Sequence, residues 1–360
     1  MSGPSPAIGA RSHGRDNNFN LIRLIASGSV LVSHSWSLTG TPGEPFERFA
    51  GFSFGHMGVD VFFVVSGFLV TGSLLGRGTL GSFLRARALR IFPALVASAF
   101  GAALVIGPFV TTLPLGRYFA DAGTWRYAFQ NSTTWPWGVR WVLPGVFAGL
   151  PGGNAVNGAL WSLPWELTMY AMLTVLGALA LRTPPLLTRP RLQAAIVGLA
   201  AVATIGHGLN EAFAFSQRFE VVQALRLVAL FFSAGALYLF RDRVPLSPVL
   251  FIASAVVLFG SLAVKGLALA LYPAALVYAV VWLALVPGGV VRRYNRLGDY
   301  SYGFYLWQFP IQQWIVLRRP ATTQPELLLY SLPAALALAV LSWHLVESPA
   351  LSLKDRRARG

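Results

Sequence analysis

Apolar runs of about 20 residues recur along almost the whole length of this 360-residue sequence. A run of that length is what an α-helix needs to cross the hydrocarbon core of a bilayer. The runs are continuous rather than alternating between apolar and polar residues, which favours helices over the strands of a membrane barrel. We expect ten spans, at roughly 20–39, 56–76, 91–110, 158–181, 193–210, 221–240, 247–264, 267–287, 299–317 and 326–346.

The composition agrees with an all-α polytopic membrane protein. Hydrophobic residues make up 55% of the chain and charged residues 11%, against about 25% charged residues in a soluble domain. We expect a disordered cytoplasmic tail over 1–18, a transmembrane domain over 19–349 and a basic cytoplasmic tail over 350–360. The segment Thr111–Asn157, rich in Trp, Gly and Pro, suits an interfacial cap or a re-entrant lid.

The distribution of basic residues predicts which way the chain faces. With both termini in the cytoplasm, 18 of the 28 Lys and Arg residues lie on the cytoplasmic side and 8 on the other. That bias follows the positive-inside rule, and an even number of spans returns the chain to its starting side. We therefore expect a multi-pass protein of the inner (plasma) membrane. The same rule accounts for the net charge of +15 without a nucleic acid partner.

The chain contains no cysteine. Disulfides, thiolate metal ligands and a cysteine nucleophile are therefore excluded. A covalent thioester intermediate on the protein is excluded for the same reason, and no metal site is expected.

The first span carries two ionisable residues, Arg23 and His34, in the stretch NFNLIRLIASGSVLVSHSWSLTG. An arginine at mid-span costs about 2.5–3.5 kcal/mol on insertion, so such residues are candidates for function. Their separation of 11 residues is about three helical turns, which puts them on one face about 16 Å apart along the axis. One explanation is a site in which His34 is a base. The other is that Arg23 snorkels to the inner headgroups and His34 bonds to a neighbouring helix.

Two carboxylates fall inside later spans. Asp60, in GHMGVDVFFVVSGFLVTG, is expected at the depth of His34, where it would orient the imidazole and raise its basicity. It would otherwise cap the start of its helix. Glu166, in NGALWSLPWELTMYAML, is expected about two turns in from the outside and needs a partner there. Its alternative role is a structural ion pair with an arginine such as Arg226.

Three arginines, Arg85, Arg87 and Arg90, cluster before the third span in FLRARALRIFP. Anchoring by the positive-inside rule explains them simply. Arginine also binds phosphate oxygens through two parallel hydrogen bonds, so the cluster is a candidate clamp for a phosphate-bearing ligand, together with Arg23. A cytosolic donor at this end, with a base and two carboxylates in the outer half, suits the transfer of a group across the membrane.

Taken in order, these motifs resemble the acyltransferase-3 family of integral membrane acyltransferases, from about Asn18 to Pro349. The pair Arg23 and His34 is the first of the motifs. The others are, in order, GVDVFFVVSGFLVTG, LRARALRIFP, LWSLPWELTMY, GDYSYGFYLWQFP and VESP. Each motif is weak alone, and their common order carries the resemblance.

The resemblance implies ten spans and transfer of an acyl group, often acetyl, from acyl-CoA as donor substrate to a hydroxyl group. Acceptors in the family are commonly surface carbohydrates: the O-antigen of lipopolysaccharide, exopolysaccharide, glycolipid or peptidoglycan. The implied partners are thus membrane lipid and a carbohydrate or glycolipid. By the same resemblance His34 is the general base, Arg23 contacts the donor or maintains the site, Arg87 and Arg90 bind CoA phosphates, and Glu166 is the motif glutamate.

One position departs from the family pattern, because Gln308 in YLWQFP stands where many relatives carry histidine. A glutamine cannot shuttle protons, so we expect it to be a hydrogen-bonding contact and His34 to act alone as the base. The sequence leaves open the acceptor, the acyl chain length and the oligomeric state. The main alternative to an acyltransferase is a transporter or flippase of a polar solute or lipid-linked sugar, which would also hold buried charges beside a cavity.

Overall fold

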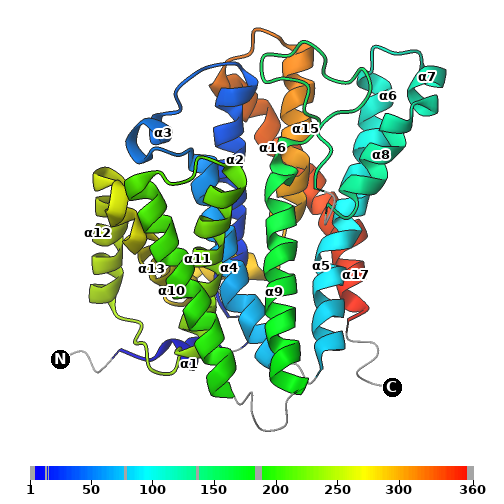
Figure 1. Cartoon of the computed structure of the whole chain (residues 1–360). Coiled ribbons are helices and arrows are strands. Elements are labelled where there is room, and N and C mark those ends of the chain that lie inside the picture. The colour runs from blue at the N-terminus through cyan, green and yellow to red at the C-terminus, as the bar shows by residue number, and fades with distance from the viewer. Residues whose placement is uncertain are drawn as a thin grey trace.

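A computed structural model describes residues 5–12, 14, 16–76, 79–134, 138–182 and 189–354. These residues form helices joined by loops, with one isolated β-bridge between Ala7 and Pro245. The long helices run side by side along a common direction (Figure 1). The expectation of an all-α protein is confirmed for the described residues.

A helical segment lies at each of the ten predicted spans. Six segments of the described chain are long and apolar enough to cross a membrane: α4 (Phe54–Gly76), Leu80–Val110 (α5, η1 and α6), Pro190–Phe213 within α10 (Arg189–Phe213), α11 (Phe219–Leu239), Gly266–Leu285 (η3 and α13) and Gln324–Ser352 (α16, η5 and α17). The other four predicted spans form α2 (Phe19–Leu38), α9 (Leu163–Arg182), α12 (Pro248–Val264) and α15 (Ser301–Arg318). Length and composition therefore support a multi-pass protein with at least these six crossings.

The N-terminal segment differs from the disordered tail that we expected. Its described residues include the short helix α1 (Ile8–Arg11), and the side chain of Ile8 is fully buried. Main-chain hydrogen bonds from Ile8 N to Val244 O (2.9 Å) and from Leu246 N to Pro6 O (2.8 Å) hold the segment against the loop between α11 and α12. An apolar anchor and satisfied main-chain groups explain why this part of the tail is ordered.

Both ends of the described chain lie toward the same end of the bundle, which we call the terminal end (Figure 1). Helix α1 lies there, and the last helix, α17 (Ser348–Ser352), also points toward it. Residues 355–360 of the predicted basic tail lie outside the described residues. The opposite end, which we call the loop end, carries the short helices α3 (Pro45–Ala50), α7 (Leu115–Ala120) and α8 (Ala122–Asn131).

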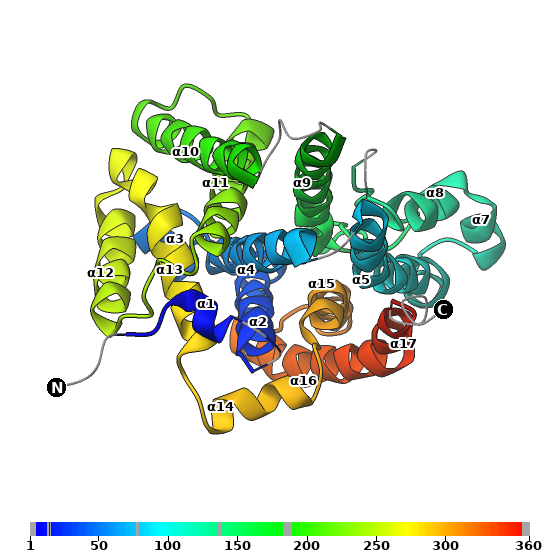
Figure 2. The same ribbon diagram turned by 90° about the horizontal axis from the view of Figure 1, so that it is seen from below.

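Helix α4 is central in the bundle and packs against α2 and α11 (Figure 2). Two glycines allow this close approach. A methyl group at Gly58 would lie 2.5 Å from the carbonyl oxygen of Ala26 in α2, and one at Gly67 would lie 2.1 Å from the carbonyl oxygen of Phe231 in α11. Small residues at helix crossings are the usual means of tight packing in lipid. The motif GVDVFFVVSGFLVTG therefore encodes helix packing as well as any chemistry.

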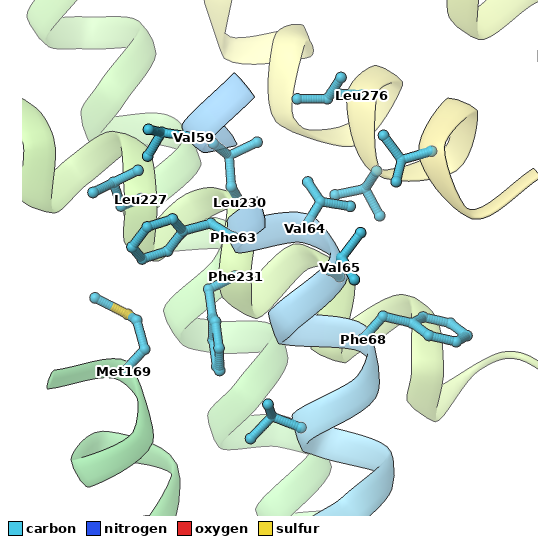
Figure 3. Close-up of a cluster of buried hydrophobic side chains, with 14 of the residues drawn as sticks. Val59, Phe63, Val64, Val65, Phe68, Met169, Leu227, Leu230, Phe231 and Leu276 are labelled. Atoms are coloured by element: carbon cyan, nitrogen blue, oxygen red, sulfur yellow. The ribbon is translucent and has the colours of Figure 1, made fainter. Parts of the chain in front are cut away.

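Large apolar side chains fill the space between α4 and its other neighbours. Figure 3 shows Phe63 of α4 and Phe231 of α11 in this cluster, with Met169 of α9 and Leu276 of α13. Each of these four side chains is buried. The cluster fixes α4 relative to α9, α11 and α13, and leaves another face of α4 to the cavities described below.

The segment Thr111–Asn157 is folded against the bundle over its described part. Helices α7 and α8 pack together, and α8 packs against α5 (Leu80–Gly101). A separate apolar cluster includes Tyr118, whose hydroxyl donates to the carbonyl oxygen of Ala103 (2.7 Å). Burial raises the pKa of Tyr118 to about 12. Two tryptophans of this segment fall within 135–137, outside the described residues.

Candidate active site

Cavities follow one face of α4 from one end of the bundle to the other. At the terminal end lies a cavity of about 660 Å³, which we call the basic cavity, and Leu69 of α4 is one of its lining residues. At the loop end lies a histidine cavity of about 390 Å³, which Val59 lines. A chamber of about 40 Å³, lined by Phe62 and Ser66, lies between these positions on the helix. Residues three or four apart share a helix face, so a single stripe of α4 borders all three spaces.

The basic cavity takes its charge from arginines of three elements. Arg23 of α2, with Arg87 and Arg90 of α5, line it, so three of the four predicted phosphate ligands share one space. Arg296, from the short helix η4 (Tyr294–Arg296), also lines it and was not singled out from the sequence. Arg85 does not; it donates instead to a main-chain carbonyl oxygen of the C-terminal segment, at 2.8 Å.

Two of these arginines converge on one carboxylate, Asp299. Arg23 forms an ion pair with Asp299 Oδ2, and Arg90 Nη2 lies 2.5 Å from the same oxygen. Arg90 Nη1 also lies 3.3 Å from Glu347 Oε2. Both carboxylates are more than nine-tenths buried. Both carboxylates therefore position arginines of the basic cavity.

Glu347 reaches this network because the helix around it is not regular. The residues Trp343–Glu347 form a π-helical turn, η5, between α16 (Gln324–Ser342) and α17. Such turns are rare and occur often at functional sites. Ser342 donates a hydrogen bond of 3.0 Å to Glu347 Oε1, which fixes the carboxylate that faces Arg90.

The guanidinium group of Arg87 is available to bind an anion in the basic cavity. Among the described residues it forms no ion pair, and its buried Nε has no hydrogen-bond partner. A buried donor without a partner destabilises a protein by about 1–3 kcal/mol. An anionic ligand in the basic cavity would remove that penalty, so Arg87 is the arginine best placed to bind one.

Glu166 lines the basic cavity together with Tyr170 and Ser66, which sets it apart from His34. Its Oε1 accepts hydrogen bonds from the hydroxyl of Tyr170 and from Ser66 Oγ (3.2 Å). Glu166 stands in the first turn of α9, directly after the 3₁₀ helix η2 (Gly158–Ser162). Glu166 therefore lies at the deep end of the basic cavity, away from the terminal end of the bundle.

His34 lines the histidine cavity at the loop end of the bundle. Its ring meets the edge of Phe309 at 4.9 Å between centroids. Its Nδ1 is buried and has no hydrogen-bond partner among the described residues. The imidazole is thus held by packing, and no carboxylate in the described chain is hydrogen bonded to it.

The same cavity holds polar side chains that the sequence analysis did not select. Glu44 is 5% exposed and accepts hydrogen bonds from Ser33 Oγ and from the main-chain N–H of residue 54, both at 2.7 Å. His56 Nδ1 lies 2.8 Å from Ser53 Oγ, and its ring packs against Trp161 at 5.5 Å. Glu44 follows a Gly-Pro-rich turn, so nothing in its spacing marked it as part of a site.

Asp60 is engaged elsewhere. Its side chain is fully buried, Oδ1 lies 3.3 Å from Arg226 Nε of α11, and Oδ2 accepts a hydrogen bond of 2.8 Å from the hydroxyl of Tyr272 of α13. Arg226 in turn donates to Gln223 Oε1 at 2.7 Å. The ion pair with Arg226 that was the alternative role of Glu166 is thus made by Asp60, which joins α4, α11 and α13.

Three glutamines of α15 show two kinds of environment. Gln312 donates to the carbonyl oxygen of Leu31 (3.0 Å), and Gln313 donates to the carbonyl oxygen of Ala155 (2.9 Å), so both bind helix or loop backbone. Gln308 is fully buried, and neither its amide nitrogen nor its amide oxygen has a partner in the described part of the chain. Buried polar atoms are nearly always paired, so Gln308 is an exception, and it lines none of the three cavities.

The arrangement suits transfer between two ligands that enter from opposite ends. One space offers arginines for an anion, and the other offers an imidazole, a second histidine and a carboxylate. Within the described residues, no group of three or more His, Cys, Asp or Glu could hold a metal ion.

Comparisons with known proteins point in the same direction. A sequence model of the acyltransferase domain matches residues 16–345. An O-acetyl transferase of Shigella phage Sf6 is 27% identical over 94% of this chain and 99% of its own length. Nodulation protein 10 of Rhizobium leguminosarum bv. viciae is 36% identical over 46% of this chain and 45% of its own length. No solved structure matches the chain.

Proposed function

This chain belongs to the acyltransferase domain family, and we propose that it is a membrane O-acetyltransferase. Its donor is cytosolic acyl-CoA, acetyl-CoA in particular, and its acceptor is a hydroxyl group of a cell-surface carbohydrate or glycolipid. The observation that carries the proposal is the pair of cavities on one face of α4, one lined by arginines and the other by His34. The O-acetyl transferase of phage Sf6, which is similar along nearly its whole length, supports the acyl group and the oxygen acceptor.

The topology we propose has ten spans in the inner membrane, with both termini in the cytoplasm. Helices stand at all ten expected positions, and the described chain begins and ends toward the same end of the bundle (Figure 1). The basic cavity opens at that end, where its lining includes Gly14 and Ser352. A cytosolic donor therefore has direct access to the arginines.

We assign the donor to the basic cavity. CoA carries phosphates, and charge-assisted bonds from arginine to phosphate are among the stronger hydrogen bonds in proteins. Arg87 has an unsatisfied buried donor, and the carboxylates around Arg23 and Arg90 fix those guanidinium groups in place. Glu166 and Tyr170 lie at the deep end, where the thioester would arrive, and we assign them to its positioning. Arg85 lies outside this cavity, and its role is anchoring.

The reaction is direct transfer with His34 as general base. The imidazole takes the proton of the acceptor hydroxyl, and the oxygen attacks the thioester carbonyl carbon. The carbon–sulfur bond breaks, the CoA thiolate leaves toward the cytosol, and the proton on the imidazole passes to it through water. The products are the ester and CoA. Asp60 supports this step indirectly, because its ion pair with Arg226 holds α4, whose stripe borders every cavity.

The lining of the histidine cavity favours a carbohydrate acceptor. Trp161 offers an aromatic face on which a sugar ring can pack, because the indole side chain combines an apolar face with a polar N–H edge. The Glu44 carboxylate and the His56 imidazole in the same space can bind further sugar hydroxyls. Hydrogen bonds from Ser33 and from the backbone hold the Glu44 carboxylate in one orientation. Its free lone pairs can therefore accept hydrogen bonds from a sugar hydroxyl at a defined position.

Labelled donor and a matched pair of histidine variants test the proposal. Membranes that carry the wild type, His34→Ala or His207→Ala would be incubated with radiolabelled acetyl-CoA and a crude extract of glycolipid and polysaccharide. His207 is a suitable control because it is buried in α10 and lines none of the three cavities. A general base contributes about 10²–10⁴-fold in rate, so base-labile label should fall by that factor in His34→Ala alone.

Each other result has a distinct meaning. Equal labelling by His34→Ala and the wild type would refute the role of His34 while keeping the enzyme. If the wild type transfers no acyl group from any acyl-CoA while solute moves across its membrane, the transporter alternative replaces the acyltransferase.

A further inference from the structure

The chamber between the two large cavities adjoins the basic cavity. The two share Phe62, Ser66, Glu166 and Tyr302 in their linings. In the other direction, Val59 of the histidine cavity precedes Phe62 by one turn of α4, about 4.5 Å along the axis. A group that enters from the basic cavity past Glu166 therefore comes next to the space that His34 lines.

The walls of the chamber are apolar and held in place. Phe62 packs edge-on against Tyr305, with ring centroids 5.6 Å apart. The Tyr305 hydroxyl donates to the carbonyl oxygen of Ala159 (2.5 Å), and the Tyr302 hydroxyl donates to a carbonyl oxygen of α5 (3.2 Å). Leu163 closes another side and is 2% exposed. Because both tyrosines are anchored to backbone, the chamber cannot widen without breaking hydrogen bonds.

The volume of the chamber sets what fits inside it. The chamber has a volume of about 40 Å³, against about 660 Å³ for the basic cavity. It therefore has room for a small acyl group and not for a long chain. An acetyl group has three heavy atoms, a butyryl group has five, and a long fatty acyl group has many more.

We propose that this chamber is the acyl pocket and that Phe62, with Leu163 and Tyr305, limits the donor to short acyl groups. The inference rests on the proposed function and goes further, because it names the residues that select the acyl chain. Bound CoA would occupy the basic cavity with its thioester beside Glu166, where the two spaces share their lining, and its acyl group would lie in the chamber. A longer chain would have to displace Phe62 or Leu163.

Donor preference tests the inference directly. We would compare acetyl-, butyryl- and octanoyl-CoA with the wild type, Phe62→Ala and Leu163→Ala, and identify the acyl group added to the carbohydrate extract by mass spectrometry. Phe68→Ala is the matched control, because Phe68 lies on the same helix, is 1% exposed and lines none of the cavities. One methylene in an apolar pocket changes transfer efficiency by about 10–200-fold.

The expected pattern is specific to the chamber. The wild type should transfer acetyl at least about 100-fold more efficiently than butyryl, for two extra methylenes. Phe62→Ala and Leu163→Ala should each raise the ratio of butyryl to acetyl transfer about tenfold or more, and Phe68→Ala should leave that ratio at its wild-type value.

Two results would overturn the inference. Equal use of acetyl- and butyryl-CoA by the wild type would show that the chamber does not hold the acyl group, even if neither variant folds. A wild-type preference that persists in an active Phe62→Ala and an active Leu163→Ala would place selection elsewhere. In both cases the acyltransferase itself would stand, whereas a wild type that uses no donor would refute the proposed function instead.

Discussion

Neutralising one partner of the Asp60–Arg226 pair should destabilise the bundle far more than removing both. Asp60 is fully buried, Arg226 is 7% exposed, and their closest atoms are 3.3 Å apart. Loss of one member of such a pair costs about 3–5 kcal/mol, because the other charge stays buried without compensation. Replacement of both members by neutral side chains is often close to neutral. We therefore expect Asp60→Asn and Arg226→Met each to lower the free energy of unfolding by about 3–5 kcal/mol.

The double variant Asp60→Asn/Arg226→Met should recover much of that loss. A double-mutant cycle on unfolding in detergent micelles measures the coupling, which should exceed about 3 kcal/mol, the loss in either single variant, because we expect the double variant to be more stable than both. The exposed pair Arg241–Asp242, with 3.8 Å between charged atoms, is the control, because surface pairs contribute about 0–1 kcal/mol. An Asp60→Asn variant as stable as the wild type would refute the reasoning.

Activity of the double variant separates two roles for Asp60. If the carboxylate only joins α4 to α11 and α13, the refolded double variant should transfer acyl groups at a rate near that of the wild type. A double variant that is stable but inactive would show instead that this pair has a role in acyl transfer beyond joining the helices.

Three further results are expected. Arg87→Gln should raise the KM for acyl-CoA by about tenfold to a hundredfold, the worth of a hydrogen bond to a charged group, while Arg85→Gln changes it less than threefold; equal effects would contradict the assignment of the basic cavity. Gly67→Ala should lower the free energy of unfolding, measured in detergent micelles, by about 3 kcal/mol or more through overpacking against backbone. Gly76→Ala, with open space around it, should leave that free energy unchanged. Gln308→Leu should stabilise the protein by about 1–3 kcal/mol, since it removes two unpaired buried atoms, and should leave acyl transfer near the wild-type rate, since Gln308 lines none of the cavities; a stable variant that has lost activity would place Gln308 at a substrate.

The helices and the shared location of three arginines could be predicted because both depend on local pattern. Apolar length marks a span, and basic residues before it mark one end of the bundle. The convergence of Arg23 and Arg90 could not be predicted, since it requires Asp299 and Glu347, which lie 209–276 residues away in sequence. Glu347 is buried at the end of a π-helical turn, and no pattern in the sequence predicts that turn.

The environments of Asp60 and Glu166 show what turn counting leaves out. Successive residues of a helix point about 100° apart, so Val59 borders the histidine cavity while its neighbour Asp60 meets α11. The direction of a side chain depends on which helices surround it, which one sequence does not tell. Glu166 follows a 3₁₀ helix, whose rise of about 2.0 Å per residue exceeds that of an α-helix. The chain therefore carries Glu166 deeper than a count at 1.5 Å per residue predicts.

Two predicted spans of adequate length, α2 and α15, are less apolar than the six candidate crossings, and both help to build the site. Helix α2 supplies Arg23 and His34, and α15 supplies Tyr302 and Tyr305 to the cavity linings, whereas α12 is apolar but short at 17 residues. Polar side chains reduce the tendency of a helix to enter lipid, and they are tolerated where they face protein or a cavity. A deficit of hydropathy in a span of adequate length thus carries information about function. Here it selects the helices that surround the cavities before any contact between them is known.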